Sequence, residues 1–245
     1  IPGLLHTHGG GMAIMSATDR MYQCYRAQLA ERGFAVVSVE FRNSSGQLGP
    51  YPYPAGLDDC LSALAWTHEN RQKLGISSLV LTGESGGGNL CSAIALRAKK
   101  EGRLNEFDGV FAMCPFIGGP ELWETKGNTS LKECDQYFVD MHAFRLCAHT
   151  YDPERMHEDD PCAWPYKAKP EDLEGLPPHI ISVNEIDPLR DEGLKYAEML
   201  QKAGVDATSR VVKTTPHAGD VICAFVPGAE HIFEETVASL KEFSK

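Results

Sequence analysis

The pentapeptide Gly83-Glu84-Ser85-Gly86-Gly87 decides the fold, because it fits the pattern G-x-S-x-G between two different kinds of structure. The apolar residues 78–82 before it predict a short strand, and residues 89–100 after it predict a helix. Glycines two residues on either side of the serine leave room for a sharp, strained turn. We expect the serine to stand exposed at the carboxyl end of the strand, where a helix N-terminus favours negative charge. The pattern predicts a nucleophile, although a glycine-rich turn with an incidental serine would share it.

Strands and helices alternate along the rest of the chain. Apolar and β-branched runs predict strands at 3–6, 34–41, 78–82, 107–114, 179–184 and 208–212. Helical spacing of apolar residues predicts helices at 18–32, 57–74, 89–100, 188–203 and 230–243. The run FAVVSVEF at 34–41 is apolar enough to be buried on both faces. This alternation indicates an α/β fold with a mostly parallel sheet and helices on both of its faces.

The length of 245 residues suits one domain, and we expect a single unit over 1–245. Residues 116–165 break the alternation, because they hold helical patches and an acidic run but no strong strand. An insertion between two sheet strands can cover a site, so we interpret 116–165 as a lid or cap insertion. A surface excursion without a function is the alternative. The chain opens at Ile1 in what resembles the end of a strand, and we expect a natural N-terminal segment before it.

Charge and cysteine content narrow the classes of partner and compartment. The 34 acidic and 23 basic residues give a net charge of -11, which repels polyphosphate and argues against nucleic acid as a partner. No apolar run of about 18 residues is present, so we expect no stable membrane insertion. Eight cysteines without C-x-x-C pairs indicate reduced thiols and favour the cytoplasm. The alternative is another compartment, reached through a targeting signal in the expected N-terminal segment. The oligomeric state stays open, and a homo-oligomer is compatible with the sequence.

The tetrapeptide His8-Gly9-Gly10-Gly11 follows the first predicted strand. Its glycines allow backbone N–H groups to face a cavity, and we expect Gly9, Gly10 and Gly86 to supply the donors of an oxyanion hole. A phosphate-binding loop is the alternative, but no G-K-[ST] or G-x-G-x-x-G pattern accompanies it. His8 is expected to brace the loop. The pair His6-x-His8 has no third ligand at suitable spacing, so we expect no metal there.

A carboxylate and a histidine follow two later strands. Asp187 comes after the predicted strand that begins at residue 179, and it is the candidate that orients a histidine. Glu185 is an alternative that spacing does not exclude. His217 lies in the loop 213–220 and is the candidate general base, with His231 as its rival. The chain order of serine, acid and histidine is the order of the α/β-hydrolase fold.

These motifs resemble the hormone-sensitive-lipase-like branch of the α/β-hydrolase superfamily, also called bacterial family IV esterases. The resemblance covers nearly the whole chain and rests on residues 8–11, 38–42, 51–55, 83–88, 160–165, 172–178, 187–193 and 196–205. It implies a triad of Ser85, Asp187 and His217, an oxyanion hole from Gly9, Gly10 and Gly86, no cofactor, and activity on short acyl esters. Two motifs depart from the family pattern: Glu84 and Gly86 stand where Asp and Ala are usual, and Ala218-Gly219-Asp220 replaces Gly-Phe after His217.

The resemblance therefore implies a serine hydrolase that cleaves a small-molecule carboxylic ester through an acyl-enzyme on Ser85. An amidase or deacetylase on the same triad is an alternative within the same chemistry. A small-molecule receptor on a hydrolase scaffold is an alternative of a different class, because fold and function are separable. Receptors of that kind lose a triad residue, commonly the histidine, whereas this sequence offers a candidate for each role.

Overall fold

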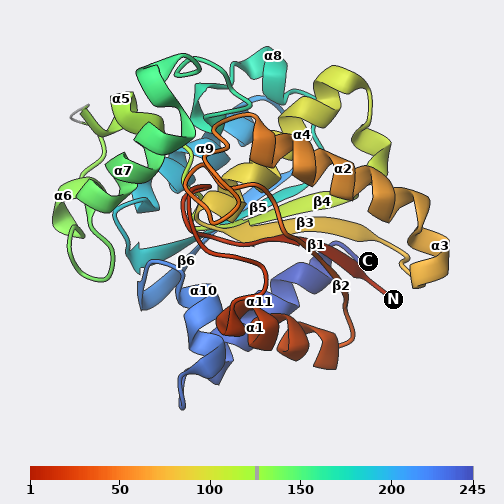
Figure 1. Ribbon diagram of the computed structural model, residues 1–245. Coiled ribbons are helices and arrows are strands. Elements are labelled where there is room, and N and C mark those ends of the chain that lie inside the picture. The colour runs from red at the N-terminus through yellow and green to blue at the C-terminus, as the bar shows by residue number, and fades with distance from the viewer. Residues whose placement is uncertain (125–126, 245) are drawn as a thin grey trace.

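The computed structural model describes residues 1–124 and 127–244, and within them six parallel strands form one sheet (Figure 1). The strand order is β2-β1-β3-β4-β5-β6. The strands are β1 (Gly3–Thr7), β2 (Ala35–Val39), β3 (Leu79–Glu84), β4 (Gly109–Met113), β5 (His179–Ile186) and β6 (Ala207–Pro216). Parallel neighbours require crossover connections, and helices supply them here. The prediction of an α/β fold with a parallel sheet is confirmed.

Helices cover both faces of the sheet (Figure 1). On one face, α1 (Arg20–Glu31) and α11 (Glu230–Glu242) share a buried cluster with the sheet, together with the short α10 (Gly219–Ile222). The opposite face packs against α2 (Ala55–Glu69), α4 (Gly86–Glu101) and α9 (Arg190–Lys202). The sheet therefore has an apolar core on each side, as a parallel sheet between two helical layers requires.

Three sequence predictions differ from the structure in detail. The helix predicted at 57–74 is divided at Asn70 into α2 and α3 (Arg71–Leu74), because Asn70 leaves helical geometry and its side chain donates to the Trp66 carbonyl. The helix after the serine begins at Gly86 rather than near residue 89. The prediction that β2 is buried on both faces is wrong: four of its five residues are only half-buried, since β2 is an edge strand.

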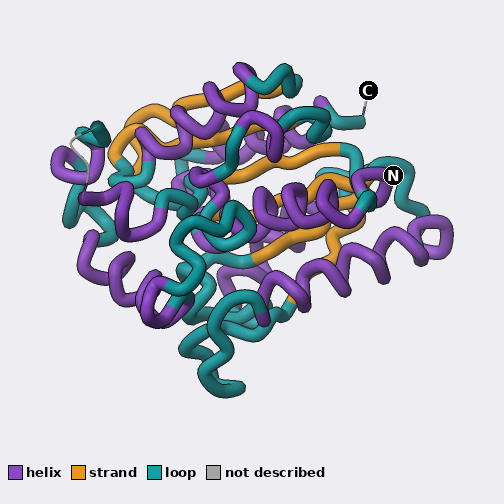
Figure 2. The backbone as a smooth tube through the Cα atoms, turned by 90° about the horizontal axis from the view of Figure 1, so that it is seen from above, coloured by secondary structure: helices purple, strands orange, loops and turns teal. Residues whose placement is uncertain are grey.

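The segment 116–165 gathers at the end of the sheet opposite to the two chain termini (Figure 2). Its described part, which leaves out residues 125–126, contains no strand. Its helices are α5 (Gly119–Glu124), α6 (Ser130–Glu133) and α7 (Met141–Tyr151), with 3-10 turns at Pro153–Arg155 and Pro165–Lys167. The remaining short elements are α8 (Pro170–Leu173) and 3-10 turns at Leu104–Glu106 and Cys223–Phe225.

Two further predictions concern the whole chain. All eight cysteines are free thiols, and six of them are buried, as expected for small apolar side chains rather than a disulfide framework. Among the described residues, no helix has the length and apolar character needed to cross a bilayer.

Candidate active site

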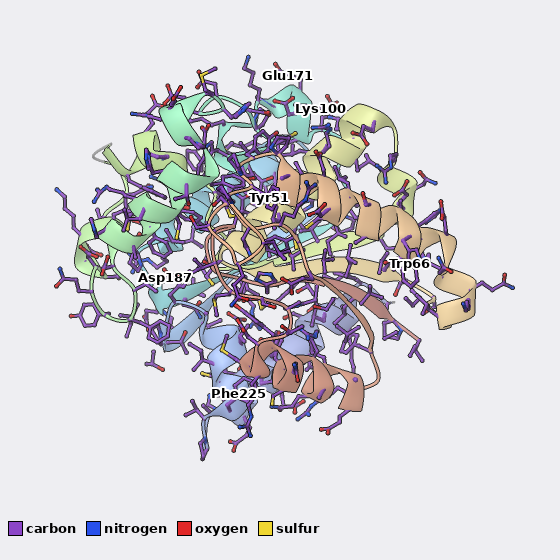
Figure 3. The ribbon with its side chains drawn as sticks, in the orientation of Figure 1. Tyr51, Trp66, Lys100, Glu171, Asp187 and Phe225 are labelled. Carbon is purple, nitrogen blue, oxygen red and sulfur yellow. The ribbon has the colours of Figure 1, made fainter. Side chains whose placement is uncertain are left out.

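The order of the sheet brings four side chains to one edge. Ser85 follows β3, Cys114 follows β4, Asp187 follows β5, and His217 follows β6. Because β3 to β6 are parallel and adjacent, their carboxyl ends meet at the same edge. Figure 3 shows Asp187 at this edge, near the ends of β5 and β6.

Ser85 occupies the strained turn that the sequence predicts. Its φ of 56° and ψ of -118° lie in a region that non-glycine residues rarely adopt. Its N–H donates to the Met113 carbonyl at 2.9 Å, which fixes the turn against β4. A Cβ atom at Gly87 would lie 2.1 Å from the Thr7 carbonyl oxygen, so only glycine fits there. Ser85 is buried rather than exposed, with 6% of its surface accessible, because the loop through Gly11 packs against Gly86 next to it.

His217 and Asp187 form a buried pair. The His217 Nδ1 lies 2.9 Å from Asp187 Oδ2, and Asp187 Oδ1 accepts the Leu189 N–H at 2.9 Å. Burial alone would lower the pKa of His217, but the Asp187 carboxylate and the neighbouring Cys114 raise it well above its ordinary value. The carboxylate thus fixes the orientation of the imidazole and favours its protonated form.

The two alternatives from the sequence do not occupy this position. Glu185 turns to the surface, where it binds Lys213 Nζ at 2.9 Å and the Thr214 N–H at 2.8 Å. His231 is exposed on the first turn of α11. The structure therefore pairs His217 with Asp187. Within the described part of the chain, the Ser85 hydroxyl makes no hydrogen bond to His217.

Cys114 is a site residue that the sequence interpretation did not single out. Its ligand atom and those of Asp187 and His217 all lie within 4.8 Å of one another. Its φ is 35°, and its N–H donates to the Ser182 carbonyl at 2.7 Å. The sequence contained a signal for this position, because Cys114 is the last residue of the predicted strand 107–114 and so lies on the same sheet edge.

The oxyanion loop, defined here as residues 8–11, corrects one prediction. The Gly9 N–H does not face a cavity, because it donates to Glu84 Oε1 at 2.7 Å and also lies 3.0 Å from the Tyr22 hydroxyl. Among the described residues, the N–H groups of Gly10 and Gly11 have no protein acceptor. A Cβ atom at Gly86 would lie 2.7 Å from the Gly11 nitrogen, so Gly86 is adjacent to that free donor.

Glu84 anchors the oxyanion loop from inside the protein. Its side chain is 2% exposed, and its second oxygen lies 3.6 Å from His6 Nε2. Burial works to raise the pKa of Glu84, but His6, the Tyr22 hydroxyl and the Gly9 N–H outweigh it and lower this pKa. The carboxylate that replaces the usual Asp of the motif is therefore held charged beneath the loop.

His8 braces the same loop, as predicted. Its ring stacks on Phe41 with a centroid distance of 4.2 Å and an interplanar angle of 10°. Its Nδ1 lies 2.8 Å from the Gly9 carbonyl oxygen. His6 faces Glu84, and the rings of both histidines lie next to Tyr22.

A second buried carboxylate anchors the base loop, defined here as residues 213–220. Asp220 is fully buried, and its Oδ1 accepts from Ser182 Oγ at 2.9 Å, from Thr236 Oγ1 at 3.0 Å and from Arg210 Nη2. On the other side of His217, Thr215 Oγ1 accepts from Asn184 Nδ2 at 2.9 Å. The sequence interpretation noted Asp220 only as a departure from the family pattern.

The helix α7 lies over this edge of the sheet. The Phe144 ring meets the His217 ring edge-on at a centroid distance of 5.4 Å. A Cβ atom at Gly11 would lie 2.7 Å from the Cys147 Cβ, so α7 also touches the oxyanion loop. Segment 116–165 thus contacts both His217 and the oxyanion loop.

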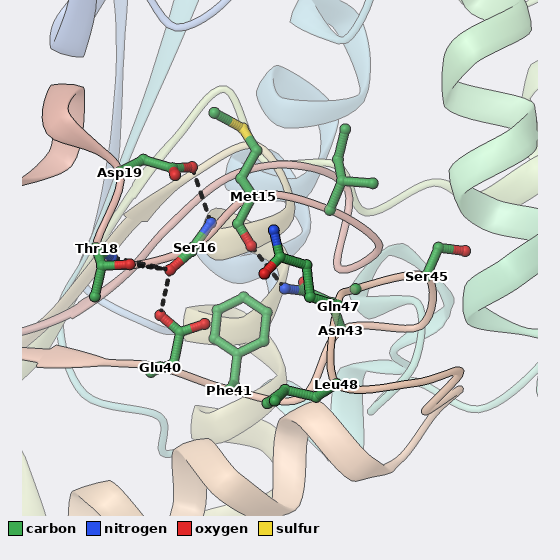
Figure 4. Close-up of a pocket in the computed structure, with 12 residues that line it drawn as sticks. Met15, Ser16, Thr18, Asp19, Glu40, Phe41, Asn43, Ser45, Gln47 and Leu48 are labelled. Atoms are coloured by element: carbon green, nitrogen blue, oxygen red, sulfur yellow. Dashed lines mark hydrogen bonds between the residues drawn. The ribbon is translucent and has the colours of Figure 1, made fainter.

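A pocket of about 490 Å³ lies beside the oxyanion loop, and its lining includes none of Ser85, Asp187 and His217 (Figure 4). Its polar side centres on Ser16, whose hydroxyl donates to Glu40 at 2.8 Å and whose N–H donates to Asp19 at 3.0 Å. Its apolar side includes Met15 and Phe41, and through them it adjoins Tyr22 and His8. The lining residues are Ile14, Met15, Ser16, Thr18, Asp19, Glu40, Phe41, Asn43, Ser45, Gly46, Gln47 and Leu48.

The chain is similar in sequence to known hydrolases and to a receptor. A family model described as the alpha/beta hydrolase fold matches residues 4–220. Carboxylesterase NlhH from Mycobacterium tuberculosis is 32% identical over 257 residues, which cover 98% of this chain and 73% of the relative. The gibberellin receptor GID1A from Arabidopsis thaliana is 31% identical over 211 residues, which cover 83% of this chain and 58% of the receptor.

One solved structure is particularly similar. Brefeldin A esterase, a bacterial homologue of human hormone-sensitive lipase, superposes with a TM-score of 0.94 and is 42% identical in sequence. The match covers 99% of this chain and 69% of that one.

Proposed function

The chain belongs to the alpha/beta hydrolase family, in its hormone-sensitive-lipase-like branch, and is an ester hydrolase. We propose that it cleaves small carboxylic esters through an acyl-enzyme on Ser85. The observation that carries the proposal is the buried Asp187–His217 hydrogen bond at the sheet edge where Ser85 occupies its strained turn. A nucleophile, an oriented base and free backbone donors at one edge are the parts that acyl transfer needs.

In the proposed first step, the Ser85 Oγ attacks the ester carbonyl carbon while His217 takes the hydroxyl proton. Asp187 holds the imidazole and stabilises the imidazolium that forms. His217 then gives this proton to the departing alcohol, which leaves the acyl group on Ser85. Water repeats the sequence, and the carboxylic acid leaves. The Ser85–His217 hydrogen bond would form in the substrate complex, since such bonds often tighten only there.

We propose that the oxyanion donors are Gly10, Gly11 and Gly86. The engaged Gly9 N–H supports this revision, because one N–H that already binds a buried carboxylate is not available to a substrate oxygen. The free N–H of Gly11 lies next to Gly86, the first residue of α4, and Gly10 precedes Gly11 in the same loop. A first-turn N–H has no acceptor inside its own helix, so it is available for an oxyanion.

We further propose that residues 116–165 act as a lid on a single catalytic unit. Contacts from α7 to His217 and to the oxyanion loop support this role. A short acyl chain is the proposed substrate preference, and the cytoplasm is the proposed compartment because the thiols are unpaired. Association into a homo-oligomer remains open to measurement by light scattering.

A label-and-turnover experiment tests the proposal. Hydrolysis of p-nitrophenyl esters from acetyl to palmitoyl would be measured for the wild type, for Ser85→Ala and for Ser62→Ala, an exposed serine control on α2. We expect turnover that favours short chains and is lost only in Ser85→Ala, with a phosphonate label on Ser85 in the wild type. Activity that survives Ser85→Ala would contradict the acyl-enzyme.

The gibberellin receptor among the relatives favours a receptor as the second candidate. The intact His217–Asp187 pair argues against it, since receptors on this scaffold commonly lose the histidine. A folded protein with neither turnover nor a label on Ser85 would support the receptor. A label without ester turnover would instead support an amidase or a deacetylase.

A further inference from the structure

Three different metal-ligand types meet at the active-site edge. The ligand atoms of Cys114, Asp187 and His217 lie within 4.8 Å of one another, and all three residues are buried. Thiolate, carboxylate and imidazole are the ligands that Zn²⁺ takes in proteins, at about 2.0 to 2.3 Å from the metal. Ligand atoms around such an ion are therefore roughly 3.5 Å apart, and side-chain shifts of under about 1 Å would close the set.

The charges of this set also suit a divalent cation. A thiolate and a carboxylate bring two negative charges, and the imidazole binds metals in its neutral form. A bound Zn²⁺ would leave the buried site without net charge, which avoids the cost of an uncompensated ion in the interior. The Cys114 thiol would release its proton to solvent, and His217 would coordinate through its unprotonated ring nitrogen.

Hydrogen bonds to the backbone hold two of the three residues, Cys114 and Asp187, in place. Cys114 is fixed at the end of β4 by its hydrogen bond to the Ser182 carbonyl, in spite of its unfavourable φ of 35°. Asp187 is fixed by the Leu189 N–H at 2.9 Å. Ligands that rigid strand ends already hold together lose little freedom when a metal binds.

We propose that Cys114, Asp187 and His217 form a binding site for one thiophilic divalent cation such as Zn²⁺, and that this cation inhibits the enzyme by occupying His217. Inhibition rests on the proposed function of His217, whereas binding of the metal does not. Cys147 on α7 provides a control for the thiol ligand. It is half-buried and touches the oxyanion loop, but it is absent from this three-residue cluster.

The first experiment measures binding without catalysis. Co²⁺ would be titrated into the Ser85→Ala protein, and its thiolate-to-cobalt charge-transfer absorption would be followed in the near ultraviolet. We expect one Co²⁺ per chain, competition by Zn²⁺, loss of the band when Cys114→Ser is added, and retention when Cys147→Ser is added. The exchange of sulfur for oxygen keeps the size of the side chain, and circular dichroism checks the fold. A band that Cys114→Ser leaves unchanged, or no band, overturns the site.

The second experiment measures inhibition. Ester hydrolysis would be titrated with Zn²⁺ in the wild type, in Cys147→Ser and in Cys114→Ser, each relative to its own metal-free rate. We expect Cys114→Ser to need at least about tenfold more Zn²⁺ than the other two, since loss of a supporting group alone weakens metal affinity about 10- to 100-fold. Equal sensitivity of all three proteins overturns the inhibitory role. If Ser85 were not the nucleophile, the esterase result would change while the Co²⁺ spectrum would not.

Discussion

Two buried carboxylates hold the two sides of the active site, and they do so with different partners. Glu84 holds the oxyanion loop through the Gly9 N–H, the Tyr22 hydroxyl and a histidine at 3.6 Å. Asp220 holds the base loop through two hydroxyls and the full positive charge of Arg210. One anchor thus fixes backbone donors close to the reaction, and the other fixes the loop that carries a side chain. The difference predicts that Glu84 matters chiefly for rate and Asp220 chiefly for stability.

Removal of the Asp220 carboxylate should have the largest effect on stability. Asp220→Ala leaves Arg210 without its buried partner, and we expect the free energy of unfolding to fall by about 3 kcal/mol. The lower end of the usual range applies because the Arg210 side chain is 20% exposed. Urea unfolding followed by fluorescence measures the change.

Two variants control this prediction. The double variant Arg210→Met with Asp220→Leu should recover much of the loss, because an apolar pair leaves no unpaired charge. Glu185→Gln removes a surface ion pair with Lys213 of the same loop and should cost less than about 1 kcal/mol. If Asp220→Ala were as stable as Glu185→Gln, the ion pair would not anchor the base loop.

Loss of the Glu84 carboxylate should act on rate. Glu84→Ala removes the shorter hydrogen bond of the Gly9 N–H and lets the oxyanion loop shift, so we expect kcat/KM to fall about 100-fold, chiefly through kcat. Glu84→Gln keeps an acceptor oxygen for Gly9 and should lose only about tenfold. Steady-state hydrolysis of a short p-nitrophenyl ester measures both. A fall carried by KM alone would show that Glu84 acts on substrate binding rather than on the oxyanion loop.

The sequence predicted the parts of this site that follow from strand ends and glycine patterns. Ser85, Asp187 and His217 each follow a recognisable strand, so their shared edge is a consequence of parallel topology. The sequence did not distinguish Gly9 from Gly11 as an oxyanion donor, because the distinction depends on which N–H group faces Glu84. Cys114 illustrates the same limit. A cysteine at a strand end has no pattern of its own, and its chemistry emerges only from its neighbours.

A further buried carboxylate sharpens the comparison, because among the residues that the structure describes no cation pairs with it. Glu192 accepts from the Ile117 and Gly118 N–H groups and from Trp123 Nε1. Burial raises the pKa of Glu192 to about 7, against these hydrogen bonds, and the charge of Asp187 adds to the rise. Glu192 in turn adds to the raised pKa of Tyr166, whose main cause is burial.

The raised pKa of Glu192 should make stability fall with rising pH. The unfolded chain ionises Glu192 near 4.5, whereas the folded chain keeps the proton up to about pH 7. The stabilisation is therefore complete below pH 4.5 and is lost as the pH rises, by roughly 2 kcal/mol between pH 5 and 7. Urea unfolding would be measured for the wild type and for Glu192→Gln at pH 5 and at pH 7. The free energy of unfolding of the variant should not show this decrease and should be closest to that of the wild type at pH 5. An unchanged slope would mean that Glu192 is ionised in both states.

The smallest effect should come from the second partner of Gly9. Tyr22→Phe removes the hydroxyl that lies 3.0 Å from the Gly9 nitrogen but leaves the shorter bond to Glu84 at 2.7 Å. A hydrogen bond to a charged acceptor is the stronger of the two, so the loop should stay in place and kcat/KM should fall about threefold or less. The same ester assay measures it, with Tyr25→Phe as the control, because within the described residues the hydrogen-bond partner of the Tyr25 hydroxyl is the Met113 sulfur at 3.8 Å. If Tyr22→Phe lost as much activity as Glu84→Ala, the hydroxyl rather than the carboxylate would hold the oxyanion loop, and the contrast between the two anchors would need to be redrawn around Tyr22.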